Sequence, residues 1–503
     1  MAINYAAAET AITANTAAGR AQATRFLQRS TFGPRPGDVA ALQTMGVQAW
    51  FDAEEAKAHD STYYDVHNAT NNYLDRQRWA RFITGDGQLR QRVAYSLSQI
   101  FCMNPGGLGK NANVYIDTLH DRAFGTYREA MEAVTYSMSM GTFLTYLRNV
   151  RFDPVTGQYP DENYARELWQ LFSIGLWELN DDGTRKKDGN GADIPTYEQT
   201  DILEHAKVFT GLREVTSGTD RELQPLYEWL PAEDYHEFGA KSYLGVDVPA
   251  GNNVDADIAL SLDTLDAHPS LPPFVAKLLI QRHVTSNPSP AYVNRVVQEW
   301  KNDGNGVRGN IAHVIRAILL DSEALTSNPP ETFGKLKEPA LRLTHTFRAL
   351  GASTTQTNPG AWPFAASERL GQNPWEPPSV FNFYRPGYTP SGTRLGEAGL
   401  VGPELQLSDA STAVNWVNWI YDQLDRVPGG LVFDEAPLQA LAGTPSALVD
   451  ELEARLCPGR LSQGRRDQIL AVLPSITTSP ADHRKVMAAV LIIITSPDFL
   501  YER

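Results

Sequence analysis

The chain has 503 residues, of which 42% are apolar and 20% charged, so it is long enough to bury a large core. Its net charge of −15, without a Lys/Arg-rich run with interleaved aromatic residues, argues against nucleic acid as a partner. No apolar run approaches the ~20 residues that a membrane-spanning helix needs. The longest such run, residues 486–494, predicts a buried helix instead.

The N-terminus and the two cysteines give limited information about the location of the protein and about its cross-links. Residues 1–19 are rich in Ala and Thr and do not have the basic start and apolar core of a signal peptide, so we expect a flexible leader. Cys102 and Cys457 are the only cysteines, which excludes a disulfide framework and a multi-cysteine zinc site. They could form one long-range bridge or remain two buried free thiols.

Apolar residues with helical spacing predict a mainly α, multi-helical fold. We expect two helical subdomains, 20–211 and 268–503, around a shared core. Between them, 212–267 predicts an irregular aromatic insertion with long loops. An Asn-Gly pair predicts a small β-hairpin near residues 184–197. The acidic residues there could instead form a calcium loop, but the closing Glu at the required offset is missing.

The segment 160–175 predicts one amphipathic helix, with a Pro-Asp first turn and a glycine stop. Glu167 lies at the edge of its apolar face, and Asn163 lies one turn before it. Burial can raise the pKa of such a carboxyl group. We therefore choose Glu167 as a candidate catalytic acid, with Asn163 and Arg166 as binding residues.

The next helix supplies the candidate partners of this acid. Thr196 and Gln199 match a capping box that would begin the helix. Asp201 and His205 are four residues apart, so they would be adjacent on its surface. We choose Asp201 as the ionised catalytic partner and His205 as a third catalytic candidate. Polar residues at the edge of a helix are, however, more often structural than catalytic.

Aromatic loops supply further binding candidates. His236 lies in the aromatic insertion and titrates near neutral pH, although a hydrogen-bonded structural histidine is the alternative. Trp375 and Tyr384 lie in the Pro-rich stretch 373–388, where they could form a platform for a sugar ring or cover the core.

Six segments together resemble a large bacterial family catalogued as domain of unknown function 1800. The most specific is Glu-Asn-Tyr-Ala-Arg-Glu-Leu at 162–168, and the others are 25–36, 196–211, 268–282, 335–339 and 379–386. The resemblance runs from about Arg20 to the C-terminus, with a departure at Leu212, where the family commonly has Trp. It implies a mostly helical protein, usually exported and often encoded beside an exported family with a sulfatase-like fold.

The resemblance also marks polar positions, but it assigns no role or activity to them. The matching residues are Arg29, Asn163, Arg166, Glu167, His236, Lys241, His268 and Arg282. We add Lys241 to the candidate binding residues on this basis. An extracytoplasmic location, periplasmic or secreted, is expected from the resemblance alone.

Three functions remain open. The first is a hydrolase acting on an extracellular glycan, a polysaccharide, through the paired carboxylates Glu167 and Asp201. The alternative is a non-catalytic binding or assembly subunit that works with a sulfatase-like partner, because the sequence contains no recognised nucleophile motif. A third is a metal-dependent enzyme that uses Asp201 with His205, His236 or His268, although these lack ligand spacing. We identify no metal motif and no cofactor motif.

Overall fold

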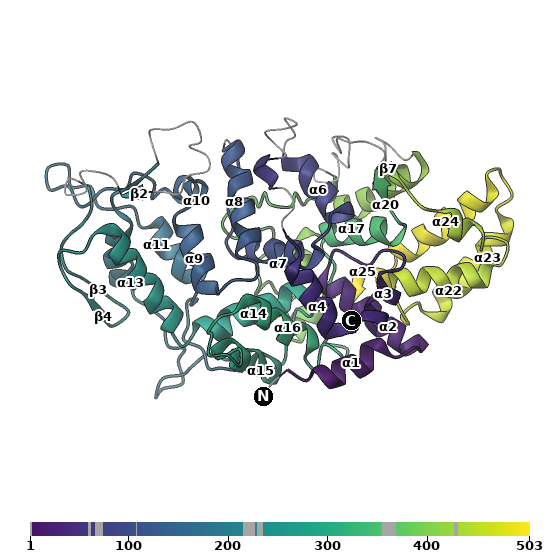
Figure 1. Ribbon diagram of the computed structural model, residues 1–503, viewed down its shortest axis with the longest axis horizontal. Coiled ribbons are helices and arrows are strands. Elements are labelled where there is room, and N and C mark those ends of the chain that lie inside the picture. The colour runs from purple at the N-terminus through teal and green to yellow at the C-terminus, as the bar shows by residue number, and fades with distance from the viewer. Residues whose placement is uncertain are drawn as a thin grey trace.

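The computed structural model describes residues 3–58, 62–65, 74–106, 108–214, 227–228, 235–354, 369–426 and 431–503. Helices build most of this part of the chain, and its strands form only two-stranded pairs, which confirms a mainly α fold. Figure 1 shows an elongated body with its long axis horizontal. None of the helices in the described ranges is both long and apolar enough to cross a membrane.

Four helices form the N-terminal region: α1 (Tyr5–Thr13), α2 (Ala17–Ser30), α3 (Asp38–Met45) and α4 (Val47–Ala56). The expectation of a flexible leader is wrong for α1. Asn4 caps this helix, and Ala8 and Ile12 are fully buried. The Glu9 carboxylate accepts a hydrogen bond from the Val47 backbone N–H at 2.8 Å. Alanines with helical spacing therefore pack into the core here.

The next helices build one end of the body and its middle (Figure 1). They are α6 (Leu74–Thr84), α7 (Gln88–Ser98), α8 (Lys110–Asp121), α9 (Tyr127–Thr135), α10 (Met138–Phe143), α11 (Asn163–Gln170), α12 (Gln199–Ala206), the 3-10 turn η1 (Lys207–Phe209) and α13 (Val254–Ala267). Helix α13 contradicts the expected irregular structure in that part of the insertion. Asn253 caps it, and Val254, Ile258 and Leu262 form a buried stripe.

The remaining helices run through the middle to the far end. They are α14 (Leu271–His283), α15 (Pro290–Lys301), α16 (Ile311–Leu320), α17 (Pro339–Ala349), α19 (Arg394–Glu397), η4 (Pro403–Leu407), α20 (Ala410–Arg426), α21 (Ala436–Gln439), α22 (Pro445–Leu456), α23 (Gln463–Val472), η6 (Leu473–Ser475), α24 (Ala481–Ile494) and α25 (Pro497–Leu500). Cys102 and Cys457 are buried free thiols, so the structure contains no bridge between them.

The described chain contains four antiparallel strand pairs, of which the last two connect distant parts of the sequence. They are β1 (Leu212–Arg213) with β2 (Tyr227–Glu228), β3 (Lys241–Tyr243) with β4 (Val246–Val248), β5 (Lys335–Leu336) with β8 (Tyr501–Glu502), and β6 (Ser353–Thr354) with β7 (Leu431–Val432). The predicted hairpin region pairs through three isolated bridges, Trp177 with Pro195, Leu179 with Arg185, and Lys187 with Asp193.

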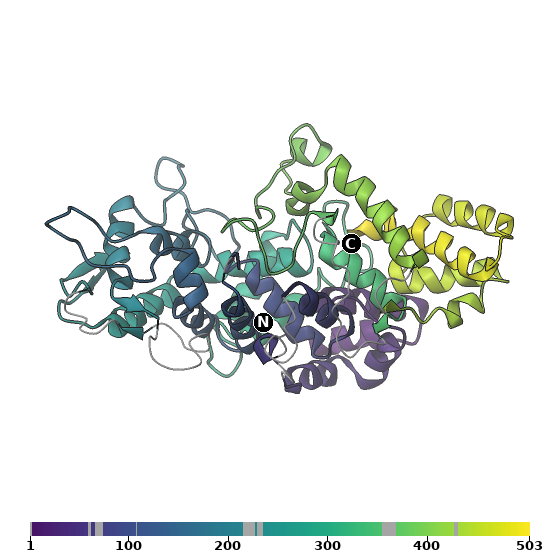
Figure 2. The same ribbon diagram turned by 90° about the horizontal axis from the view of Figure 1, so that it is seen from above.

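The first and last parts of the chain pack together. Helix α2 contacts both α16 and α22, and α7 contacts α14. In Figures 1 and 2, the N-terminal helices accordingly lie beside the C-terminal ones. Buried apolar residues from all these helices form one continuous cluster, which confirms the predicted shared core.

Candidate ligand-binding cleft

Helix α11 places the Glu167 side chain in the interior of the protein. The helix begins at Asn163, not at Pro160, because Asn149 brackets the backbone of Asp161 with two hydrogen bonds before the helix starts. Glu167 is 6% exposed, and its Oε2 has no hydrogen-bond partner among the described residues. Burial raises the pKa of Glu167, and the charge of Arg166 only partly opposes this.

The other α11 candidates do not contact Glu167 through hydrogen bonds. Arg166 pairs with Glu162 at 2.7 Å. The Asn163 backbone N–H donates to Asp161, and no hydrogen bond joins the Asn163 side chain to Glu167 in the described chain. Arg166 and Asn163 therefore stabilise the first turn of the helix.

Asp201 and His205 have the contacts of structural residues. Helix α12 begins with a capping box between Glu198 and Asp201, so the predicted box at Thr196 is wrong. Thr196 belongs to the hairpin region instead, where its N–H donates to the Leu176 carbonyl. His205 is fully buried, 2.7 Å from Ser261 Oγ, and burial lowers its pKa to about 3. It is therefore neutral at physiological pH, and a catalytic role for Asp201 and His205 remains a prediction.

His236 and Lys241 belong to a second buried cluster, around Asp257 on α13. The Asp257 carboxylate lies 2.6 Å from Lys241 Nζ and 3.3 Å from His236 Nε2, and all three side chains are fully buried. Asn252 Nδ2 donates a hydrogen bond to the other carboxylate oxygen, Oδ1, at 3.0 Å. Burial alone would raise the pKa of Asp257, but these hydrogen bonds and the charge of Lys241 hold it below its usual value. The cluster joins the strand pair β3–β4 to α13.

Trp375 and Tyr384 lie in the core. Of the two alternatives considered, a platform for a sugar ring or a cover for the core, their burial matches the cover. Trp375 is 3% exposed and packs edge-on against Tyr95 at a ring-centroid distance of 5.7 Å. Tyr384 is 2% exposed, and its hydroxyl donates to Glu338 at 2.8 Å. Neither ring is accessible as a platform for a sugar.

Two adjoining cavities of about 680 and 540 Å³ form a cleft between α14 and the segments 175–185 and 380–387. Ligand sites typically measure roughly 300–1,000 Å³. The two cavities share seven lining residues, Leu176, Trp177, Arg185, Phe274, Leu278, Pro386 and Gly387. We call the larger one the outer cavity and the smaller one the inner cavity.

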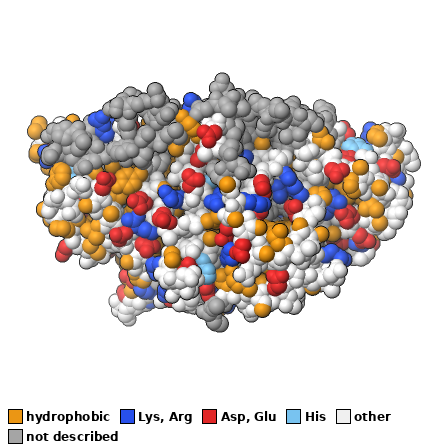
Figure 3. All heavy atoms as spheres, in the orientation of Figure 1, with side chains coloured by type: hydrophobic (Ala, Val, Ile, Leu, Met, Phe, Trp, Pro, Cys, Tyr) orange, Lys and Arg blue, Asp and Glu red, His pale blue; other side chains and the backbone are white. Residues whose placement is uncertain are grey.

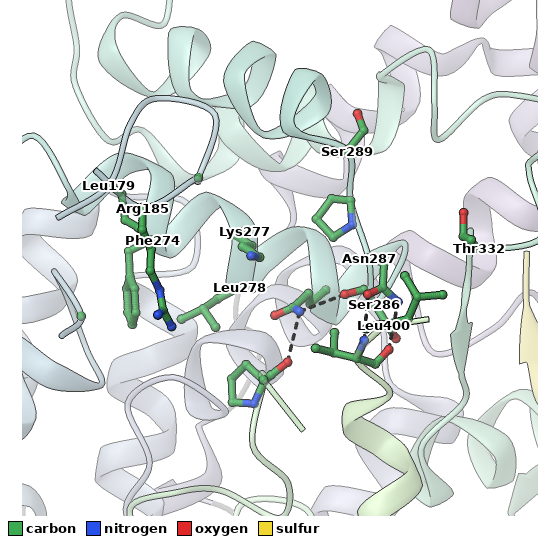
Figure 4. Close-up of a pocket in the computed structure, with 18 of the residues that line it drawn as sticks. Leu179, Arg185, Phe274, Lys277, Leu278, Ser286, Asn287, Ser289, Thr332 and Leu400 are labelled. Atoms are coloured by element: carbon green, nitrogen blue, oxygen red, sulfur yellow. Dashed lines mark hydrogen bonds between the residues drawn. The ribbon is translucent and has the colours of Figure 1, made fainter. Parts of the chain in front are cut away.

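Helix α14 contributes residues to the lining of both cavities. Its residues Phe274, Lys277, Leu278, Gln281 and Arg282 recur at i, i+3, i+4, i+7 and i+8, and so share one face. Gly175 allows the hairpin segment to approach this face, because a Cβ there would lie 2.8 Å from the Phe274 ring. Gln281 Nε2 donates to the Ser286 and Pro386 carbonyls, which fixes two neighbouring loops (Figure 4).

Arg282 is the central feature of the inner cavity. It is 2% exposed, yet no described residue accepts a hydrogen bond from its guanidinium, and its Nε is buried without a partner. Its Cζ lies 4.7 Å from the ring centroid of Tyr384. Burial by itself would lower the pKa of Arg282, but Tyr384 and two nearby carboxylates raise it, so it stays protonated. Nearby carboxylates thus compensate the charge, but a buried donor without an acceptor is costly unless a ligand completes it.

The charges behind Arg282 show why it stays unpaired. Glu338 accepts hydrogen bonds from Gln99, Gln372 and Tyr384, and Glu404 pairs with Lys335 at 3.1 Å. Burial would raise the pKa of Glu338, but the charges of Lys335 and Arg92 hold it below its usual value. Arg92 and Lys335 also donate to the Arg282 carbonyl, which satisfies the end of α14. Arg282 therefore shares the field of these two carboxylates with other cations, but it donates a hydrogen bond to neither of them among the described contacts.

Asn382 is a second unsatisfied group in the inner cavity. It is 6% exposed, and neither its Oδ1 nor its Nδ2 has a hydrogen-bond partner in the described ranges. Its φ of +63° is uncommon for a residue other than glycine. Cys102 lines the same cavity, and burial raises its thiol pKa to about 12.

Three further cations line the cleft. Lys277 and Arg385 have no ion-pair partner in the described part of the chain, and Arg185 pairs with Asp193 on the exposed hairpin. Lost hydration on the cavity wall and the charge of Arg185 lower the pKa of Lys277. Figure 4 shows Arg185 beside Phe274 and Lys277 on the same wall of the outer cavity. Over the face drawn in Figure 3, by contrast, acidic and basic side chains are interspersed.

The sequence-chosen candidates do not line this cleft. Of α11, Gln170 lines the inner cavity, whereas Glu167 one turn earlier does not. The family resemblance marked Arg282 as a polar position without a role, and the sequence analysis did not identify Asn382 as a candidate. The signal that could have found this site is the polar series Lys277, Gln281 and Arg282 in an otherwise apolar helix.

Comparisons with known proteins bear on identity but not on activity. The comparison with curated proteins found no match, and the comparison with solved structures found none either. The family model described as "Protein of unknown function (DUF1800)" matches residues 25–501, nearly the whole chain, so the chain belongs to this family.

Proposed function

We propose that the protein binds an anionic ligand with an apolar or ring-shaped part in the cleft along α14. The observation that carries this proposal is the buried guanidinium of Arg282, which faces the inner cavity without a hydrogen-bond partner in the described chain. Charged hydrogen bonds to a carboxylate or phosphate are the interactions such a group lacks. Trp177, Phe274 and Phe381 supply apolar walls around it.

The electrostatics of the cleft support the same proposal. Arg185, Lys277, Arg282 and Arg385 line the two cavities, whereas Glu323 is the single carboxylate among their described lining residues. Glu323 already binds Arg295 at 2.9 Å and Ser289 at 2.6 Å. A cation-lined cleft in a chain with a net charge of −15 concentrates anions locally.

This arrangement supports binding more strongly than glycoside hydrolysis. Hydrolysis requires two carboxyl groups roughly 5–10 Å apart on either side of the bond that is cleaved. The described cleft offers no such pair, and Asp201 is engaged at a helix start. We therefore favour the non-catalytic alternative of the sequence analysis. An extracytoplasmic location and a sulfatase-like partner stay part of the proposal, and fractionation of the host tests the location.

Charge-selective labelling of Cys102 tests the proposal without knowledge of the ligand. We would compare the reaction rates of an anionic, sulfonate-bearing methanethiosulfonate and its cationic ammonium counterpart. Cys102 lines the inner cavity, and Cys457 is a buried thiol that lines neither cavity, so it serves as an internal control. The ratio of the two rates cancels the raised thiol pKa.

We expect the anionic reagent to modify Cys102 at least about tenfold faster than the cationic one, because the interaction with one nearby unpaired charge exceeds ~1.4 kcal/mol at low dielectric. Arg282→Gln should reduce this preference, and the other cations of the cleft account for what remains. Lys110→Ala is the control variant, because it removes a cation that does not line the cleft. Equal rates for wild type, no labelling by either reagent, or a preference that is as large in Arg282→Gln as in wild type would contradict the proposal.

A further inference from the structure

We infer that the inner cavity takes an acidic sugar, with Arg282 binding the carboxylate of the sugar and Asn382 binding two neighbouring hydroxyl groups. This inference rests on the proposed function and names the class of its ligand. It starts from Asn382, because a buried amide that makes no hydrogen bond is costly and rare in native proteins.

The position of Asn382 is fixed by its backbone. The Asn382 N–H donates to the Ser379 carbonyl at 3.1 Å within the Pro-rich segment. Asparagine tolerates a positive φ better than most residues. The backbone alone would accept glycine here, so the unpaired amide is a feature that the turn does not require. It lines the same cavity as Arg282, on a segment 100 residues away in sequence.

The chemistry of an amide distinguishes among anionic ligands. Asn382 offers one donor group and one acceptor side by side. Two adjacent hydroxyl groups match this pair, because one can accept from Nδ2 while the other donates to Oδ1. Fully ionised phosphate or sulfonate offers acceptors only and would leave Oδ1 unpaired. A carboxylate that carries no hydroxyl groups also offers acceptors only, and would likewise leave Oδ1 unpaired.

The walls of the cavity fit the remainder of a sugar acid. Trp177, Phe274 and Phe381 line it together with Leu278, and only Phe381 among the three rings is largely exposed, at 41%. The C–H face of a pyranose ring packs against aromatic rings while its hydroxyl edge reaches polar groups. A uronic acid combines a ring of this kind, a carboxylate and adjacent hydroxyl groups.

Three ring-shaped probes separate these contributions. Glucuronate carries the carboxylate and the hydroxyl groups, cyclohexanecarboxylate carries only the carboxylate, and glucose carries only the hydroxyl groups. Their dissociation constants would be measured by ligand-detected NMR titration of the full chain. The variants are Arg282→Gln and Asn382→Gly, since glycine adopts the same φ without strain. Thermal melting checks that both variants are folded.

We expect wild type to bind glucuronate about tenfold more tightly than cyclohexanecarboxylate, the effect of one or two neutral hydrogen bonds. Asn382→Gly should equalise the two acids, and Arg282→Gln should weaken both about 10- to 100-fold. If wild type binds neither acid, the proposed function fails as well. If both acids bind equally, if Asn382→Gly keeps the preference, or if glucose binds as tightly as glucuronate, the acidic-sugar inference alone is overturned.

Discussion

The cluster around Asp257 and the cleft around Arg282 both hold charged side chains inside the protein, but they differ in how those charges are completed. Asp257 receives Lys241, His236 and Asn252, so the fold itself supplies its partners. In the described chain, the Arg282 guanidinium has no hydrogen-bond partner of this kind and lines a cavity instead. A paired buried charge joins elements of the fold, whereas an unpaired one at a cavity indicates a ligand. The predictions below test this distinction.

The largest effect is expected at the paired cluster. Lys241→Met removes the cation at 2.6 Å from Asp257 and leaves a buried carboxylate without its counter-charge. Breaking a buried pair in this way should lower the free energy of unfolding by ~3–5 kcal/mol, measured by urea denaturation. Lys186→Met, which removes a half-exposed pair with Glu178, is the control and should cost less than ~1 kcal/mol. Similar losses in both variants would contradict the structural role of the cluster.

Lys337 is a buried cation that has no ion-pair partner in the described chain and lines neither cavity of the cleft. Its Nζ lies 3.0 Å from His345 Nδ1 and 4.0 Å from the Phe499 ring, and burial lowers its pKa from 10.5 to about 8. Between pH 8 and 10.5 the unfolded chain binds more protons than the folded chain, so this group makes stability rise with pH.

Lys337→Met removes that dependence. The stability of the variant relative to wild type should therefore fall by about 3 kcal/mol between pH 7.5 and 10.5, because each pKa unit corresponds to ~1.36 kcal/mol. Urea denaturation at several pH values measures the difference, in which the titration of all other groups cancels. A difference that stays constant with pH would show that Lys337 titrates normally.

Removing the unpaired cation should have a small effect on folding. Arg282→Met leaves Arg92 and Lys335 to balance Glu338 and Glu404, so we expect the free energy of unfolding to change by less than about 1 kcal/mol. Lys335→Met, at the same site, breaks the pair with Glu404 and should cost ~3–5 kcal/mol. Equal losses would mean that Arg282 is a structural cation, and would remove the basis of the proposed function.

The smallest effect is expected at Glu167. No described cation pairs with its buried carboxyl group, so Glu167→Gln should change stability at pH 7 by less than ~1 kcal/mol, in the stabilising direction. Because the folded pKa of Glu167 is raised, wild type is most stable below its unfolded pKa and loses this advantage as pH rises. The difference from Glu167→Gln should vanish near pH 4 in thermal melts. A large loss of stability would reveal a partner for this carboxylate.

Local patterns in the sequence predicted which segments form helices and which form the hairpin. The apolar run 486–494 predicted the buried helix α24, and the Asn-Gly pair indicated the hairpin that carries Arg185. Such features depend on residues within one or two turns of each other. The same patterns misplaced the starts of α11 and α12. Asn149 binds the backbone of Asp161 before α11 begins, and Glu198 forms the capping box of α12 in place of Thr196.

Tertiary structure decided which polar residues are completed. His205 is neutral because Ser261 and the core surround it, and Lys241 is structural because α13 brings Asp257 to it. Arg282 looked like any other arginine near a helix end. Its role depends on the lack of a hydrogen-bond acceptor among the described residues, while Lys335 pairs with Glu404 and Arg92 donates to the Arg282 carbonyl. A chain determines its helices locally, but whether a charge is paired depends on every element that packs around it.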